Sequence, residues 1–292
     1  MNNKSKRLVL FLDGCITIRI LLVILAMKIN HINIYKYIFT YIYMIIFNKL
    51  YGRLGNNIIQ LSNIIDIAIA YKHNIKINVK KLDFFDLSVI EKYFNKYNNS
   101  EIITDNNNFF YSTRLPFEND IFKQNIEERN KILQKAFLIN NINKLPVNDI
   151  VIHIRSGDIF STEPHPNYVP PPLSYYTKQI NKCKYEKIHI ICEDTINPVV
   201  NKLLKLYKNA VYEKNTLEKD IRIILGATNI IFSVGTFIPA LMLLSNYNKY
   251  LYGKVCEKEY GTSEELKEYY KVMNPWKNTI EQRNYILTYD YN

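Results

Sequence analysis

Cysteine and several common catalytic motifs are scarce or absent in this chain of 292 residues. There are only four cysteines, Cys15, Cys183, Cys192 and Cys256. They form no Cys-x-x-Cys pair and no His/Cys array, so neither a disulfide framework nor a structural zinc site is indicated. No Asp-x-Asp pair, HExxH, GxSxG or Walker loop occurs anywhere. A metal-chelated diphosphate is therefore disfavoured, and we expect no bound metal.

The composition is that of a folded, basic protein. Apolar residues make up 48% of the chain and the formal net charge is +11, so the chain can bury a core and could attract anions. The lysines are scattered, however, which is typical of solvated faces. Without a zinc-finger spacing, an RNP-like segment or a KH loop, a nucleic-acid partner is not expected.

The first 49 residues form a hydrophobic leader with two interpretations. A basic flank precedes residues 8–27, a stretch of membrane-spanning length that Asp13 and Arg19 interrupt, and a second aromatic-rich run covers residues 34–47. A membrane anchor within residues 8–47 would place the protein at a Golgi-like, ER-like or host membrane. The two charges oppose insertion, and a buried or interfacial helical extension, or a poorly folded leader, would leave the protein cytoplasmic.

A small α/β unit follows the leader. Gly52 to Asn57 punctuates the chain, and apolar residues then nearly encircle a predicted helix over residues 58–71, which should be buried. Residues 75–79 alternate apolar and polar side chains as a strand does. From residue 83 to 143 the sequence is aromatic, Asn-rich and weakly periodic, which indicates short helices and loops.

After Pro146 strands and helices alternate. Pro198 suits the first position of one helix, and two apparent capping boxes, Asn215 with Glu218 and Thr262 with Glu265, would start two others. The predicted strands lie near residues 149–154, 187–192, 210–212, 229–233 and 250–252. This alternation predicts a parallel sheet with right-handed crossovers, as in doubly wound nucleotide-binding folds.

The expected organisation is therefore an α/β chain with four parts. They are a leader (1–49), a small α/β domain (50–145), a Rossmann-like nucleotide-binding domain (146–255) and a carboxy-terminal helical segment (256–292).

The strand tip from Val151 to Asp158 is the most informative stretch. A β-branched run here ends abruptly in His153, Arg155 and Asp158. His153 and Arg155 share one strand face and would meet a ligand beyond the carboxyl edge of the sheet. The planar fork of an arginine at this place suits a phosphate group.

A second constellation follows a later strand. Ser233, Gly235 and Thr236 separate an apolar strand from an apolar helix that begins at Phe237. Exposed N–H groups, the helix dipole and a close-approach glycine would form a phosphate cradle complementary to Arg155. The alternative is that Ser233 and Thr236 only cap a buried helix.

Two further groups each have a catalytic or binding interpretation beside a structural one. Asp194 ends another strand and could accept hydrogen bonds from a base or a ribose, or cap the following helix. Glu163 and His165 lie in a proline-rich loop and are conceivable acid/base groups, although most such surface histidines do no chemistry.

Two of these motifs resemble a known superfamily. Gly52-Arg53-Leu54-Gly55-Asn56-Asn57 with Gln60 resembles the amino-terminal signature of α-1,2-fucosyltransferases (glycosyltransferase family 11) and protein O-fucosyltransferases. His153-Ile154-Arg155-Ser156-Gly157-Asp158 is similar to their His-x-Arg-Arg-x-Asp donor motif. The match runs in the right order from Gly52 to Leu244, without support in its middle third.

The resemblance implies a GT-B fold, in which two Rossmann-like domains face a cleft. Residues 50–145 would be a reduced acceptor-side domain, and residues 146–255 would bind the nucleotide sugar. The implied reaction is inverting transfer from GDP-fucose to a glycan or protein hydroxyl, without metal or cofactor. The resemblance also implies Arg155 on the β-phosphate, with His153 and Asp158 organising the motif, and Asn56 near the transferred sugar. Ser233, Gly235 and Thr236 would form the phosphate-binding turn, and Asp194 would contact guanine or ribose.

One departure from the family pattern leaves alternatives open. Ser156 stands where the second arginine of the pattern is expected. A glycosyltransferase with another nucleotide-sugar donor, and a non-catalytic, membrane-tethered carbohydrate-binding protein, therefore stay as alternatives.

Overall fold

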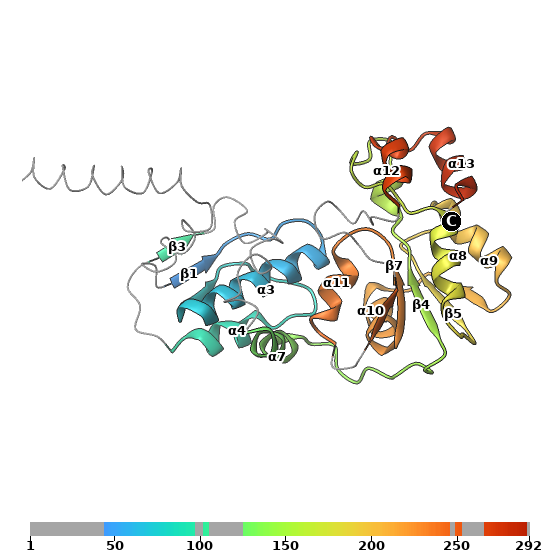
Figure 1. The fold of residues 1–292 in the computed structure, drawn as a ribbon. Coiled ribbons are helices and arrows are strands. Elements are labelled where there is room, and N and C mark those ends of the chain that lie inside the picture. Colours follow the sequence, from blue (N-terminus) through green and yellow to red (C-terminus); the bar gives the residue numbers. More distant parts are fainter. Residues whose placement is uncertain (1–43, 97–101, 105–124, 246–248, 253–265, 291–292) are drawn as a thin grey trace, which may run out of the picture.

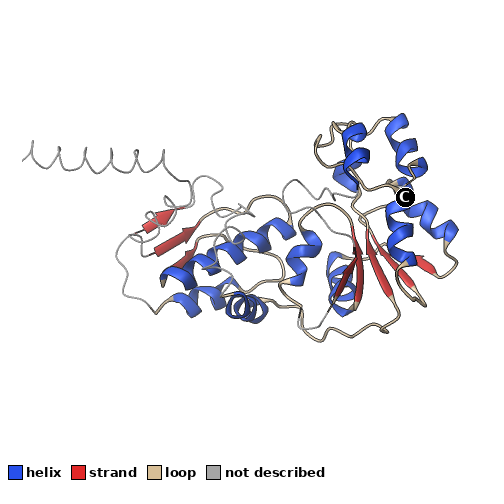
Figure 2. Ribbon diagram, viewed as in Figure 1, coloured by secondary structure: helices blue, strands red, loops and turns tan. Residues whose placement is uncertain are grey.

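Two parallel sheets with helices packed against them make up the fold, as the predicted α/β class requires (Figures 1 and 2). The structure is a computed structural model and describes residues 44–96, 102–104, 125–245, 249–252 and 266–290. Residues 8–43 of the predicted membrane anchor lie outside this part of the chain. Among the described residues no helix is long and apolar enough to cross a bilayer.

The amino-terminal sheet has the strand order β2-β1-β3, all parallel. Its strands are β1 (Met44–Phe47), β2 (Asn74–Ile77) and β3 (Ile102–Thr104). The assignment of residues 44–47 to the leader is thus wrong, because they form the central strand. Ile45 and Phe47 are fully buried and Met44 and Ile46 are partly buried, but all four side chains are apolar, so the sequence Met-Ile-Ile-Phe cannot be distinguished from the apolar run before it.

Among the described residues, three helices accompany this sheet: α3 (Leu54–Tyr71), α4 (Leu87–Phe94) and α7 (Ile126–Ala136). As predicted, α3 is largely buried, with side chains such as Ile58, Leu61 and Ile65 fully covered. It begins four residues earlier than expected, so the punctuating motif itself supplies its first turn. Asp86 caps α4 by accepting a hydrogen bond from the Ser88 amide.

The larger sheet has the parallel strand order β6-β5-β4-β7-β8. All five strands were predicted from sequence, at slightly different bounds: β4 (Ile150–His153), β5 (Ile188–Ile191), β6 (Ala210–Tyr212), β7 (Asn229–Phe232) and β8 (Tyr250–Tyr252). The chain runs outward from β4 to β6 and then returns to the other side of β4 with β7. The order therefore reverses between β4 and β7, the point where doubly wound sheets bind ligands.

The crossover helices are α8 (Leu173–Asn181), α9 (Pro198–Leu206), α10 (Leu217–Gly226) and α11 (Phe237–Met242). Pro198 does occupy the first turn of α9. The capping box predicted at Asn215 is wrong, because Thr216 caps α10 through the Lys219 amide; a hydroxyl one residue later meets the same orphan donors. The predicted box at Thr262 lies outside the described residues.

Two apolar clusters form the core. One contains Val151 of β4 and Ile230 of β7 with buried side chains of α3, α10 and α11, so it continues from the amino-terminal unit to one face of the larger sheet. The other contains Ile150 and Ile152 with residues of α8, α9 and the carboxy-terminal helices. Consecutive residues of β4 thus enter opposite clusters, as strand geometry requires.

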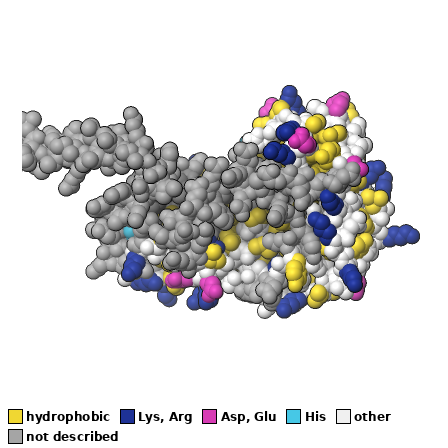
Figure 3. All heavy atoms as spheres, viewed as in Figure 1, with side chains coloured by type: hydrophobic (Ala, Val, Ile, Leu, Met, Phe, Trp, Pro, Cys, Tyr) yellow, Lys and Arg dark blue, Asp and Glu magenta, His cyan; other side chains and the backbone are white. Residues whose placement is uncertain are grey.

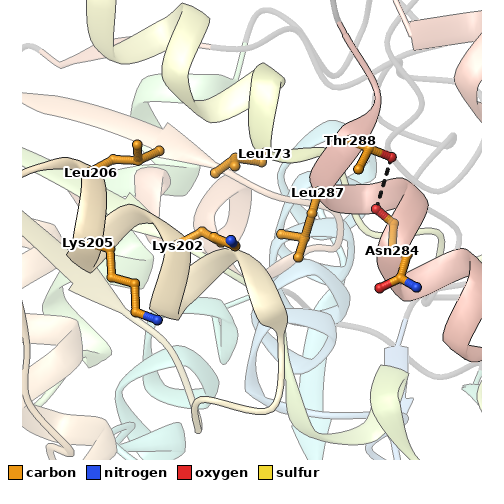
Figure 4. A pocket seen from close by; sticks show the side chains of 7 residues that line it. All are labelled: Leu173, Lys202, Lys205, Leu206, Asn284, Leu287 and Thr288. Carbon is orange, nitrogen blue, oxygen red and sulfur yellow. Dashed lines mark hydrogen bonds between the residues drawn. The ribbon is translucent and has the colours of Figure 1, made fainter.

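The carboxy-terminal helices α12 (Lys267–Met273) and α13 (Ile280–Thr288) pack near the start of α8 (Figure 1). Between α8, α9 and α13 lies a pocket of about 440 Å³ with an apolar floor and two lysines (Figure 4); it is lined by Leu173, Lys202, Lys205, Leu206, Asn284, Leu287 and Thr288. On the face drawn in Figure 3, the lysine and arginine side chains of the described residues are spread among apolar and acidic ones.

Candidate functional site

Arg155 lies at the carboxyl edge of the larger sheet, directly after β4. Its side chain is 18% exposed, and its Nη2 donates to Asp158 Oδ2 at 3.0 Å. A Cβ atom placed on Gly235 would come within 2.8 Å of Arg155 Nη1. The guanidinium therefore lies against the turn that follows β7, where the sequence places it, and it does so at the switch point of the sheet.

Gly235 is required here for two reasons. Its φ is +106°, a backbone conformation that side chains disfavour. Any Cβ would also occupy the space of the Arg155 guanidinium. The sequence predicts that a phosphate approaches Gly235 closely. In the protein without a ligand, the Arg155 guanidinium, which is expected to bind that phosphate, makes this approach instead.

The first turns of α3 and α11 meet beside this guanidinium. A Cβ on Gly55 would lie 2.8 Å from the backbone nitrogen of Phe237, so only glycine permits the approach. Thr236 Oγ1 donates to Asn56 Oδ1 across the junction. Helix amino termini carry unsatisfied N–H groups and positive partial charge. The junction therefore brings the Gly52–Asn57 motif and the turn from Ser233 to Thr236 into one region that favours anions.

Arg53 is a second cation in this region that the sequence interpretation did not single out. It donates from Nη1 to Glu193 Oε2 at 2.8 Å, and its Nη2 lies 3.7 Å from Asp158 Oδ2. Its side chain is 62% exposed. The sequence feature that indicates its role is a basic residue directly before the start of α3, inside the Gly52–Asn57 motif.

The arginines Arg53 and Arg155 therefore share the carboxylate of Asp158. The Arg53–Asp158 pair is exposed, and exposed ion pairs are worth only about 0 to 1 kcal/mol. A phosphate, which accepts charge-assisted hydrogen bonds from guanidinium, could replace a carboxylate at small cost. The arrangement can hold an anion between two cations and two helix starts.

Ser156 and Asp194 support the turn that carries Arg155. Ser156 Oγ donates to Asp194 Oδ1 and accepts a hydrogen bond from the Asn197 amide. The same Asp194 oxygen accepts from the Ile196 amide at 3.0 Å. Asn197, and not Asp194, caps α9. The ribose or base contact of Asp194 stays a prediction, and the Ser156 hydroxyl is committed to the protein itself.

Ser233 and Thr236 differ in accessibility. Ser233 is 2% exposed, and its hydroxyl has no hydrogen bond within the described residues. Thr236 is partly exposed and lies at the start of α11 without capping it through its side chain. Their phosphate-binding role stays a prediction, in which Thr236 and the Gly235 turn would face a ligand more directly than Ser233.

His153 packs on the start of α11. Its ring centroid lies 5.4 Å from that of Phe237. Burial, reinforced by the nearby Arg155 guanidinium, lowers the pKa of His153 to about 4. The imidazole is therefore neutral at physiological pH and adds no charge to the site.

The lowered pKa of His153 predicts a loss of stability in acid. Between about pH 6.5 and pH 4 an unfolded chain would protonate this histidine while the folded one would not. The contribution is thus complete above pH 6.5 and is lost as the pH falls, by up to about 3 kcal/mol. Asp66, whose pKa is raised to about 6 mainly by burial, changes stability in the opposite sense over part of this range.

The measurement is therefore a comparison between proteins. Urea unfolding of the wild type and of His153→Gln at pH 7.5 and pH 4.5 should give a wild-type free energy that falls more steeply in acid. Parallel changes in the two proteins would contradict the prediction.

Glu163 and His165 are exposed in the loop after Arg155. The His165 ring lies 4.9 Å from that of Tyr168, and its Nδ1 accepts a hydrogen bond from the Asn167 amide. Their acid/base role stays a hypothesis. Among the described residues no group of three or more His, Cys, Asp or Glu side chains could hold a metal ion.

No family model matches the chain, and no curated protein matches it. Solved fucosyltransferase structures are similar in fold. POFUT1 in complex with GDP has a TM-score of 0.42 at 12% identity, covering 72% of this chain and 98% of that one. POFUT1 in complex with GDP-fucose has a TM-score of 0.40 at 11% identity with the same coverage.

NodZ alpha-1,6-fucosyltransferase soaked with GDP-fucose has a TM-score of 0.36 at 12% identity, covering 70% of this chain and 93% of that one. What the chain can do chemically is inferred below from its own side chains.

Proposed function

We propose that this protein is an inverting, metal-independent glycosyltransferase that moves fucose from GDP-fucose to a hydroxyl of a glycan or protein. The observation that carries the proposal is the Arg155 guanidinium held against the Gly235 turn at the switch point of the sheet. The two sequence motifs support it, because Arg53 of the first motif lies 3.7 Å from Asp158 of the second, and Asn56 of the first motif accepts a hydrogen bond from Thr236 beside the Gly235 turn.

In the proposed reaction the acceptor oxygen attacks the anomeric carbon while the bond from that carbon to the diphosphate oxygen breaks. The departing GDP takes the bonding electrons, and the acceptor loses its proton to a base that we leave unassigned. Arg155 and the backbone amides of the Gly235 turn would stabilise the charge that develops on the diphosphate. Arg53, which shares the carboxylate of Asp158 with Arg155, would add a second positive charge.

A panel of nucleotides and nucleotide sugars tests the donor. A ligand at 100 times its dissociation constant stabilises the folded state by about 2.7 kcal/mol. We expect GDP and GDP-fucose to raise the melting temperature without added metal, and UDP, UDP-hexoses and ATP to leave it unchanged. Hydrolysis of GDP-fucose to GDP and fucose, followed in the same panel, should show the same preference.

The panel also decides between the alternatives. If only another nucleotide sugar stabilises the protein and is turned over, fucose is not the transferred group. This alternative is open because Ser156 stands where the family pattern has a second arginine. Glycan binding without stabilisation by any nucleotide would favour the carbohydrate-binding alternative. Membrane association through residues 8–47 is a separate proposal, which sedimentation with liposomes of the full chain and of a variant lacking residues 1–43 would test.

A further inference from the structure

Tyr168 contacts the side chain on which the proposed function depends. The Arg155 Cζ atom lies 4.0 Å from the centroid of the Tyr168 ring. A guanidinium in this position is attracted by the face of an aromatic ring. Arg155 is therefore held on two sides, by the Tyr168 ring and by its hydrogen bonds to Asp158, while Nη1 faces Gly235.

The loop that carries Tyr168 is fixed by the carboxy-terminal helical segment. The amide of Trp276 donates to Pro166 O at 2.8 Å, and the buried hydroxyl of Tyr269 donates to Pro170 O at 2.8 Å. Trp276 Nε1 also donates to Ile159 O. The first two bonds fall on either side of Tyr168, and both of their acceptors are prolines, which restrict the backbone at these positions.

We propose that Tyr168 is a positioning residue, whose ring keeps the Arg155 guanidinium turned toward Gly235. α12 and the segment around Trp276 hold the loop in the conformation that places this ring. The inference rests on the proposed function for its catalytic consequence, but the positioning itself is a property of the protein without ligand. It assigns the carboxy-terminal helices a part in the site although they contribute no residue to it.

The test uses the full chain and three tyrosine substitutions, with Arg155→Lys added to assign the NMR signal. Tyr168→Phe keeps an aromatic face beside Arg155, and Tyr168→Leu removes it. Tyr185→Leu is the matched control, because Tyr185 is also partly exposed and contacts another ring, that of Tyr207, away from Arg155.

The first readout does not depend on any substrate. In a nitrogen-15 NMR spectrum, the side-chain signal of Arg155 is identified as the one that disappears in Arg155→Lys. The ring current of Tyr168 should displace this signal from the position of a free arginine. We expect the displaced signal to persist in Tyr168→Phe and Tyr185→Leu and to return toward the position of a free arginine in Tyr168→Leu. An unchanged displacement in Tyr168→Leu would overturn the proposal.

The second readout is donor turnover. Tyr168→Leu should lower kcat/KM about tenfold, while Tyr168→Phe and Tyr185→Leu should stay within about twofold of the wild type. Equal losses in Tyr168→Leu and Tyr168→Phe, with the NMR signal intact in Tyr168→Phe, would overturn the role of the ring. If the wild type turns over no nucleotide sugar, the proposed function is wrong, and the NMR readout still decides whether the Tyr168 ring lies against Arg155 in solution.

Discussion

Arg155→Ala is expected to lower the turnover of the nucleotide-sugar donor by about 100- to 1000-fold, the usual effect of removing one preorganised donor to a developing negative charge. The reason is its position: the guanidinium lies at the sheet switch point, beside the Gly235 turn and the converging starts of α3 and α11. Arg155→Lys should lie between the alanine variant and the wild type, because it keeps the charge but not the planar fork.

The measurement is steady-state donor hydrolysis and transfer by purified proteins whose unfolding transitions are first shown to be intact. Arg222→Ala is the control, since Arg222 is a more exposed arginine that pairs with Glu218 on α10. Wild-type rates in a folded Arg155→Ala protein would exclude the proposed role of this residue.

Arg129→Met should cost about 3 to 5 kcal/mol of the free energy of unfolding near pH 8, because it leaves a buried carboxylate without its partner. Asp66 on α3 and Arg129 on α7 form an ion pair of 2.8 Å, with side chains 1% and 9% exposed. The other carboxylate oxygen of Asp66 is buried without a hydrogen bond in the described structure. Among the described residues, Arg129 is the cation that pairs with Asp66.

The loss should depend on pH in a defined direction. Burial already raises the pKa of Asp66 to about 6, despite the opposing effect of Arg129. Without the arginine this pKa must rise further, so the carboxyl can become neutral in acid and the cost of burying it falls. Urea unfolding of Arg129→Met should thus show a larger deficit relative to the wild type at pH 8 than at pH 5.

Two variants make this result specific. Asp66→Leu combined with Arg129→Met removes both charges and should recover much of the lost stability. Arg222→Met breaks an exposed arginine–carboxylate pair with the same 2.8 Å separation and should cost no more than about 1 kcal/mol. A deficit for Arg129→Met as small as that for Arg222→Met would show that the pair contributes little.

The larger sheet was predictable because its strands are short apolar runs between helices with clear start signals. Pro198 and the buried strand before Arg155 are examples in which one local pattern has one common structural outcome. The amino-terminal sheet was predicted less well. Its central strand, Met44–Phe47, continues an apolar sequence without a break, and β3 lies within a stretch without periodicity.

The residues of the candidate site were also partly predictable. Arginine after a buried strand and glycine before a helix are local signals, and both residues lie where parallel-sheet geometry places them. Arg53 and Tyr168 were not assigned a role at Arg155, because their importance depends on partners more than ten residues away in the chain. The same holds for Ser156, whose hydroxyl serves Asp194 and the start of α9.

The amino-acid sequence by itself determined the α/β class, the parallel strands after residue 146 and the presence of Arg155 and Gly235 at strand ends, because hydrophobic periodicity and turn residues act over a few neighbouring positions. Only the tertiary structure decided that β4 and β7 are adjacent and that the starts of α3 and α11 touch through Gly55. It also decided which aromatic ring lies against Arg155. Such contacts join segments far apart in the chain, and their geometry is set by the packing of the whole core.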